Sequence, residues 1–251
     1  TRPRTAGEKG DAMSRQVTEK LIQRHINQWN RLRDFLMESP VETSPAPGPV
    51  ITVSRQAGSG GRSLATALAQ RWELELHDQS LVERIARDER LEKAIVAQLD
   101  EKTVSQTRLW VQGVLHNRLF LKDDYHTALV KTISNLAARG GVVFLGRGAN
   151  LILGEHAHLR IRLVASHASR LANIMDRTGL SRSEARAIIE ETDLNRAEFI
   201  RKVFNTEPGD AQNFDVTFNT DRMDLEQMTE AATLLLLGRR ANVSRKIPSQ
   251  V

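Results

Sequence analysis

A short glycine-rich segment carries the residue types best suited to hold phosphate groups. It consists of Gly58, Ser59, Gly60, Gly61, Arg62 and Ser63. Backbone amides in such a turn can close around phosphate oxygens, and a following helix adds the positive end of its dipole. Arg62 supplies a fixed charge for the terminal phosphates, and Ser63 has the hydroxyl that commonly binds Mg²⁺ in this setting. The segment therefore predicts a site for ATP and Mg²⁺.

The residues around this segment predict a strand before it and a helix after it. Residues 50–53 are a β-branched run, and residues 64–72 read LATALAQRW, with apolar residues on one side. The usual phosphate loop reads Gly-x-x-x-x-Gly-Lys-Ser/Thr, whereas here Gln56 stands at the opening glycine and Arg62 at the lysine. A glycine turn that only allows close packing remains an alternative interpretation.

Four further short segments have the composition of strands, and helical sequence separates each from the next. They are residues 74–77, 142–146, 160–165 and 215–219. Strands that alternate with helices predict a parallel, doubly wound α/β sheet. Two intervals, 79–141 and 166–213, are longer than simple crossovers. We expect both to overhang the carboxyl edge of the sheet, where they would bind a second substrate and exclude water.

Charged residues in the second interval are further candidates for a phosphate site. Arg170 and Arg177 stand seven residues apart on a helix expected over 167–178, so they share one face. Ser181 and Glu184 form a capping box that predicts the start of the next helix, which is also rich in charge. A solvated helix face is the alternative explanation for these arginines.

The two ends of the chain predict appendages to a single domain. The expected division is 1–38 for a helical extension, 39–49 for a proline-rich linker, 50–238 for the domain and 239–251 for a basic tail. An apolar stripe at Ile22, Trp29 and Leu36 is typical of an amphipathic helix. Such a helix packs on its own domain or pairs with a second copy in a homodimer, and the stripe is compatible with both.

The composition limits the classes of function that remain. The formal net charge is +5, from 36 basic and 31 acidic residues, which favours polyanionic ligands without specifying them. Aromatic residues make up 4% of the chain, which argues against a stacking platform for single-stranded nucleic acid. The sequence has no cysteine, no signal-peptide pattern and no apolar run of membrane length, so we expect a cytoplasmic location.

Three segments in the same order resemble the cytidylate kinase-like family. They are residues 51–86, with Ser-Arg before Gly-Ser-Gly-Gly-Arg, residues 142–153 (VVFLGRGANLIL) and residues 214–228 (FDVTFNTDRMDLEQM). The lysine-free loop is a trait of that family. The resemblance implies the three-layer α/β fold of P-loop kinases, built on a five-stranded parallel sheet. Residues 79–141 would be the acceptor-binding insertion, and residues 166–213 would be the lid.

The resemblance also implies roles for individual residues. Asp78 would lie on the acceptor side, and Arg147 would reach the acceptor phosphate or the transferring group. Asp193 and Arg196 match an acid and an arginine near the end of the family's lid and would bind the acceptor. A simple helix cap is an equal alternative for Asp78. The expected catalytic set is Arg62, Arg147, Arg170 and Arg177.

The chain departs from ordinary cytidylate kinases at one motif. Their Asp-Gly-Arg-Asp turn reads Leu-Gly-Arg-Gly here, with Leu145 and Gly148 in place of the two acids. We expect transfer from ATP to a small phosphorylated acceptor, a nucleoside monophosphate such as CMP or dCMP. The alternatives are a kinase of another small metabolite and an inactive nucleotide-binding regulatory module. Neither nucleic acid nor a membrane is expected as a partner.

Overall fold

The computed structural model describes residues 48–97, 99, 101–116 and 124–245. The predicted helical extension, most of the linker and the last residues of the basic tail lie outside the described residues. Within them, five strands form one parallel sheet in the order β2-β3-β1-β4-β5. The strands are β1 (Val50–Arg55), β2 (Glu75–Asp78), β3 (Val142–Leu145), β4 (Leu159–Val164) and β5 (Val216–Asn219). The predicted parallel, doubly wound sheet is confirmed.

The register of the sheet gathers chemically active residues at one edge. Leu145, the last residue of β3, pairs with Asp78 at the end of β2 and with Val53 of β1, so β2 and β3 end at one level and β1 continues two residues further, to Arg55. Because the strands are parallel, their carboxyl ends share that edge, where open α/β sheets bind ligands. The loop after β1 and the turn after β3 leave the sheet side by side.

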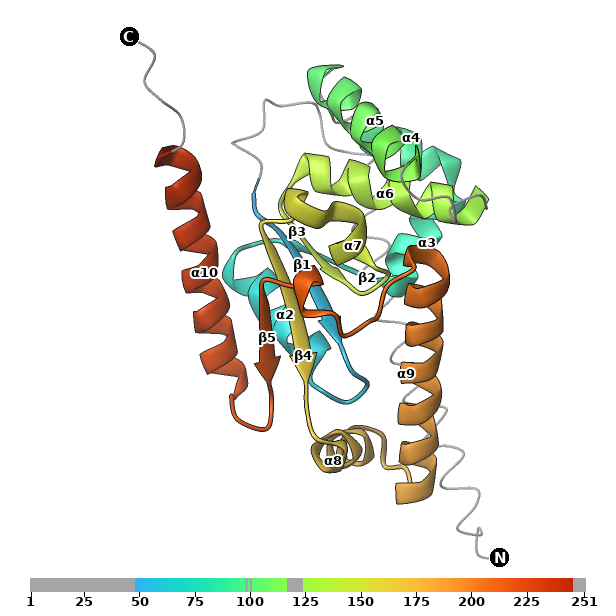
Figure 1. The fold of residues 1–251 in the computed structure, drawn as a ribbon, viewed down its shortest axis with the longest axis vertical. Coiled ribbons are helices and arrows are strands. Elements are labelled where there is room, and N and C mark those ends of the chain that lie inside the picture. The colour runs from blue at the N-terminus through green and yellow to red at the C-terminus, as the bar shows by residue number, and fades with distance from the viewer. Residues whose placement is uncertain (1–47, 98, 100, 117–123, 246–251) are drawn as a thin grey trace, which may run out of the picture.

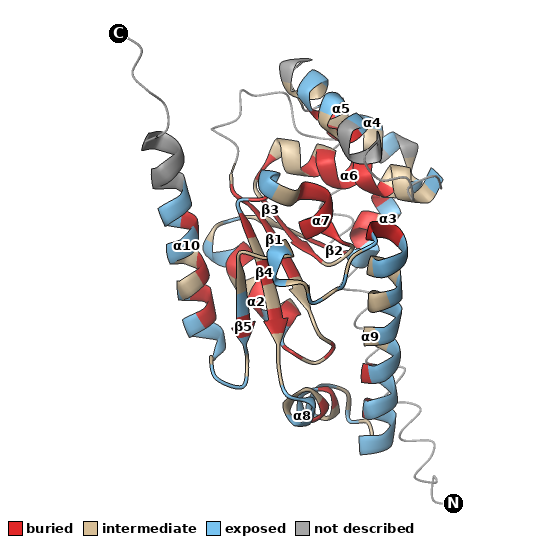
Figure 2. Cartoon of the chain, in the orientation of Figure 1, coloured by how far each residue is buried: buried red, intermediate tan, exposed pale blue. Residues whose placement is uncertain are grey.

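The two faces of the sheet bury separate apolar clusters. Helices α2 (Gly61–Arg71) and α10 (Leu225–Arg245) lie on one face, over strand side chains such as Ile51, Val143 and Ile161. The other face packs around Phe144 against α3 (Gln79–Arg87), α6 (Asp124–Arg139) and α7 (Ala149–Leu153). Figure 2 shows the buried residues concentrated in the strands and in the sides of these helices that face them. Each fully buried Leu or Phe side chain contributes about 1.5–3 kcal/mol.

The two long intervals are helical. Residues 79–141 include α3, α4 (Glu89–Ala97), α5 (Glu101–His116) and α6, and α6 contacts the other three. The second interval contains α8 (His167–Thr178) and α9 (Arg182–Phe204), joined by a tight turn below the sheet in Figure 1. The predicted bounds of α8 and the capping box of Ser181 and Glu184 are confirmed.

Short 3-10 turns complete the connections. The turn η1 (Gly154–His156) leads from α7 into β4, and η2 (Ala211–Asn213) precedes β5. Among the described residues, no helix combines the length and apolarity that spanning a bilayer requires.

Candidate active site

The glycine loop connects β1 to α2 and leaves the start of α2 open to a ligand. Gly58 and Gly60 have φ values of +80° and +78°, a left-handed backbone that favours glycine. Gly60 is the N-cap residue of α2, and no side chain caps the helix there. The first-turn amides are therefore available to an anion. Ser63 lies exposed in this first turn, in the position expected for a hydroxyl ligand of Mg²⁺.

Gln56 explains why the loop begins without a glycine. Its backbone N–H donates to the carbonyl of Leu163 at 3.2 Å, and its side-chain Oε1 accepts from the N–H of Ala165 at 3.1 Å. The hydroxyl of Ser59 in turn donates to the Gln56 carbonyl at 2.9 Å. A glycine would lose the side-chain bond, so the glutamine fixes the loop to the end of β4.

Arg62 is held by Asp78 across the edge of the sheet. Its Nη2 lies 2.7 Å from Oδ2 of Asp78. The other carboxylate oxygen accepts from Ser80 Oγ at 2.8 Å and from the Leu81 N–H at 3.1 Å, so Asp78 also caps α3. Burial alone would raise the pKa of Asp78, but the hydrogen bonds from Arg62, Ser80 and Leu81 outweigh it and hold the pKa at about 2. The charge of Arg62 is thus balanced by a protein carboxylate.

Helix α8 packs directly on the glycine loop. Asn173 donates from Nδ2 to the Gly58 carbonyl at 2.9 Å, and a Cβ placed on Gly58 would lie 2.5 Å from the backbone oxygen of Arg170. The contact is reinforced by an apolar cluster that joins the loop to α8 and α9. Its members are Ala57, Leu171, Ile174, Ala185 and Ile189. Only glycine at position 58 permits this approach.

Asp193 of α9 connects the glycine loop and α8 to α9. Its Oδ1 accepts from the N–H of Ala57 at 2.7 Å, and its Oδ2 pairs with Arg170. Arg196, one turn further along, lies 3.7 Å from Oδ1 of Asp193. Arg170 is thus occupied by a carboxylate, whereas Arg177 lies exposed further along α8. The two arginines predicted to act together have different surroundings.

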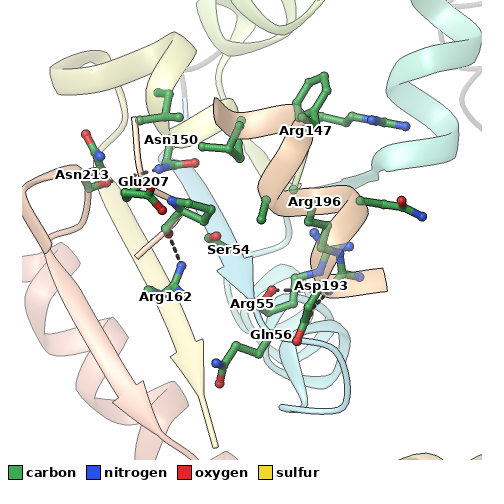
Figure 3. A pocket seen from close by; sticks show the side chains of 18 of the residues that line it. Ser54, Arg55, Gln56, Arg147, Asn150, Arg162, Asp193, Arg196, Glu207 and Asn213 are labelled. Atoms are coloured by element: carbon green, nitrogen blue, oxygen red, sulfur yellow. Dashed lines mark hydrogen bonds and ion pairs between the residues drawn. The ribbon is translucent and has the colours of Figure 1, made fainter. Parts of the chain in front are cut away.

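The Gly-Arg-Gly turn after β3 has an unusual backbone. Gly146, Arg147 and Gly148 have φ values of +89°, +54° and +66°, so even the arginine adopts the left-handed region. Arg147 forms an ion pair with Glu83 of α3, and its guanidinium carbon lies 5.1 Å from the centre of the Phe199 ring. In Figure 3 its side chain leads away from Arg55 and Arg196. Arg147 therefore lies on the side of α3, within the first long interval.

Arg55, at the end of β1, is a candidate site residue that the sequence analysis did not assign. Its side chain runs past Gly61 and over Gly146, since a Cβ on Gly61 would lie 2.7 Å from its Cβ and one on Gly146 would meet its Nη1. Arg196 donates to its backbone carbonyl at 3.4 Å. The available signal was its place at the carboxyl end of a buried strand, directly before the glycine loop.

A cavity of about 470 Å³ opens beside these residues, between α9, the sheet and the turn after β3. Its charged lining consists of Arg55, Arg147, Arg162, Arg196, Asp193 and Glu207. Among the described residues, the cations therefore outnumber the carboxylates. Arg162 is a second candidate that sequence analysis missed, on the face of β4 opposite its buried leucines; it donates to the carbonyl of Pro208 and lies 5.3 Å from the Phe214 ring centre.

The structure brings together some of the predicted residues and not others. Arg147, Asp193 and Arg196 line the cavity, and so do Arg55 and Gln56 at the start of the glycine loop. The lining does not include the predicted loop residues 58–63, nor Asp78, Arg170 or Arg177. In the described part of the chain, no three His, Cys, Asp or Glu side chains form a metal-binding group. Ser63, exposed in the first turn of α2, could hold Mg²⁺ together with phosphate oxygens and water.

Comparisons with known proteins place this arrangement in a family. A sequence model of the cytidylate kinase-like family matches residues 50–222. No curated protein sequence matches the chain. The crystal structure of an uncharacterized protein from Eubacterium ventriosum ATCC 27560 is similar, with 17% identity, a TM-score of 0.52, and coverage of 76% of this chain and 98% of that one.

Two solved kinases resemble the chain more distantly. Shikimate kinase from Bacteroides thetaiotaomicron is 14% identical with a TM-score of 0.40, and the match covers 74% of this chain and 96% of that one. A gluconokinase from Sinorhizobium meliloti 1021 is 18% identical with a TM-score of 0.42, and the match covers 80% and 97% of the two chains.

Proposed function

Because the chain belongs to the cytidylate kinase-like family, we propose that it transfers the terminal phosphoryl group of ATP to a small anionic acceptor, in the first instance a nucleoside monophosphate such as CMP or dCMP. The observation that carries the proposal is the excess of positive charge in the cavity next to the glycine loop. Arg55, Arg162 and Arg196 line the cavity, and among the described residues Asp193 and Glu207 are the only carboxylates in its lining. Arginines that outnumber the carboxylates around a half-buried cavity favour an anionic ligand.

The proposed chemistry needs positioning and charge more than it needs a base. An oxygen of the acceptor phosphate attacks the γ-phosphorus of ATP, the bond from that phosphorus to the β–γ bridging oxygen breaks, and ADP leaves with that oxygen. An ionised phosphate oxygen has no proton to lose, so no general base is assigned. Negative charge spreads over the equatorial oxygens in the transition state, and fixed cations stabilise it.

Each part of the site has a role in this proposal. The uncapped start of α2, with Gly60 and Gly61, holds the β- and γ-phosphates of ATP. Mg²⁺, held by Ser63 and phosphate oxygens, supplies charge neutralisation when bound. Arg196 and Arg147 face the acceptor, and α8 excludes water above the loop. Arg62, fixed by Asp78, orients the start of α2 and adds charge at its edge.

A coupled assay of ADP formation tests the proposal directly. The full chain is incubated with ATP, Mg²⁺ and each acceptor of a panel, with CMP and dCMP first. We expect ADP and phosphorylated acceptor in equal amounts, and a loss of at least about 100-fold in kcat/KM for Arg196→Met, because one charge-stabilising donor is worth 10²–10³ in rate. ATP binding without turnover for any acceptor would instead identify a nucleotide-binding regulatory module.

A second acceptor class is favoured by the turn after β3. An acid in place of the buried Leu145 would be a buried charge, and a Cβ on Gly148 would lie 2.4 Å from the Phe204 ring, so neither acid of ordinary cytidylate kinases fits here. A kinase of another small phosphorylated metabolite fits the same cations without those acids. The acceptor panel separates the two acceptor classes. Only a nucleoside monophosphate kinase should have a higher kcat/KM for CMP or dCMP than for sugar phosphates.

A further inference from the structure

We propose that Arg55, which projects from the end of β1, binds the terminal phosphates of the nucleotide and takes the place of the lysine that the glycine loop lacks. The identity of the anion as a nucleoside triphosphate rests on the proposed function. That Arg55 binds an anion is independent of the proposed function, because it follows from the contacts and charges around the side chain.

Two glycines make room for the Arg55 side chain. At Gly61, a Cβ would lie 2.7 Å from the Cβ and Cγ of Arg55, and at Gly146 it would collide with Nη1. Gly61 is the first residue of α2 and Gly146 follows β3, so the guanidinium lies between the glycine loop and the turn after β3. Any other residue at either position would displace it. The arginine thus occupies the junction where a transferring phosphoryl group must pass.

The guanidinium of Arg55 is a half-buried cation that has no ion-pair partner among the described residues. Within the described residues it forms no hydrogen bond or ion pair, although it lines the cavity. Burial first, and then the nearby charges of Arg196, Arg62 and Arg147, lower the pKa of Arg55 to about 9, and Asp78 opposes them only in part. A cation held in this way is destabilising until an anion arrives.

Arg62, at the lysine position of the loop, differs in just this respect. Its Nη2 is 2.7 Å from Asp78 Oδ2, and its side chain is 41% exposed. An arginine that already has a carboxylate partner gains less from a phosphate than one that has none. We therefore expect the bound phosphates to interact more strongly with Arg55 than with Arg62.

The experiment compares two strand arginines in the full chain by thermal unfolding with and without inorganic tripolyphosphate. Arg55→Met removes the unpaired cation, and Arg160→Met removes one that pairs with Asp215 at 2.8 Å outside the cavity. In the wild type, tripolyphosphate at one hundred times its dissociation constant should raise Tm by about 5 °C or more. Arg55→Met should abolish this rise, and Arg160→Met should keep it.

The starting stabilities give an independent readout. Without the anion, Arg160→Met should unfold at a lower temperature because Asp215 loses a partner, whereas Arg55→Met should unfold no earlier than the wild type. Arg55→Lys keeps a charge and should retain part of the rise, and Arg55→Gln repeats the comparison should Met prevent folding. A wild type that tripolyphosphate does not stabilise, or a rise that persists in Arg55→Met, overturns the assignment.

The outcomes for this proposal and for the proposed function are separable. If tripolyphosphate stabilises the wild type and not Arg55→Met, but no acceptor consumes ATP, Arg55 remains an anion-binding residue and the kinase activity is wrong. If the wild type turns over and Arg55→Met retains kcat/KM within about threefold, the kinase stands and Arg55 is not its phosphate ligand. A loss of at least about 100-fold in kcat/KM for Arg55→Met would support both proposals.

Discussion

The glycine loop and the cavity beside it lie next to each other but satisfy their charges in opposite ways. In the loop region, Arg62 pairs with Asp78 and Arg170 pairs with Asp193, and α8 covers the turn through an apolar cluster. In the cavity, Arg55 has no carboxylate partner among the described residues, and Arg162 donates only to the backbone carbonyl of Pro208. The loop region balances its charges internally, whereas among the described residues two of the four arginines that line the cavity have no carboxylate partner, and we propose that an anionic ligand balances them.

The difference shows that position in a motif does not decide which arginine is available. Arg62 occupies the lysine position of the loop, yet its charge is already balanced by Asp78. Arg55 lies outside the motif, on the preceding strand, and remains unbalanced. An unpaired charge in a half-buried site is the stronger indication of ligand binding, because folding gains nothing from it.

The largest expected effect comes from placing an acid at Gly148, which would make the turn resemble that of ordinary cytidylate kinases. In Gly148→Asp a Cβ would lie 2.4 Å from the Phe204 ring at a φ of +66°, and the new carboxylate would be buried. Overpacking against Phe204 together with the strain of the left-handed backbone should lower the free energy of unfolding by about 3 kcal/mol or more. Urea denaturation measures this change.

Gly141→Asp is the matched control for that variant. Gly141 has nearly the same φ, +67°, but a Cβ there meets nothing within 4 Å. The cost should be about 1 kcal/mol, the strain of the left-handed backbone alone. Equal decreases in the free energy of unfolding in the two variants would mean that the Phe204 side chain moves aside, and that the wall of the cavity can accept an acid.

An intermediate effect is expected at Gly58, on the loop side of the comparison. In Gly58→Ala the methyl group would lie 2.5 Å from the backbone oxygen of Arg170, so α8 must move away from the loop. Strain and lost packing should lower the free energy of unfolding by about 2–3 kcal/mol. Gly60→Ala has nearly the same φ, +78°, and nothing within 4 Å, so it should cost about 1 kcal/mol. If Gly58→Ala were no worse than Gly60→Ala, the close docking of α8 would be wrong.

Much of the fold followed from local patterns in the sequence. Strands that alternate with helices specified a parallel sheet, and the serine and glutamate of the capping box marked the start of α9 without any tertiary information. The glycine loop could be recognised from its composition, because its left-handed backbone favours glycine. These features depend on residues close together in the chain.

The charge balance of the site could not be predicted in this way. Arg62 and Asp78 are 16 residues apart, and the contact between Ala57 and Asp193 spans 136 residues, so the partner of each charge depends on how the elements pack. Arg55 and Arg162 were missed because the sequence shows only that Arg55 ends a strand and that Arg162 alternates with buried residues, and neither position indicates which charges lie nearby. The sequence shows which groups are charged, but the fold decides which of them remain unpaired.

The smallest expected effect concerns the Arg62–Asp78 pair and its dependence on pH. The pKa of Asp78 is about 2 in the folded chain, below the value of about 3.9 in an unfolded one, so its ionisation stabilises the fold above pH 4 and loses this effect as the pH falls toward 2. The difference in free energy of unfolding between the wild type and Asp78→Asn should therefore shrink by about 2 kcal/mol between pH 4 and pH 2. Arg62→Met should move this loss to higher pH, because burial then raises the pKa of Asp78 with less opposition. Urea denaturation across the pH series measures both effects, and a difference that stayed constant from pH 4 to pH 2 would show that Arg62 is as free of a carboxylate as Arg55.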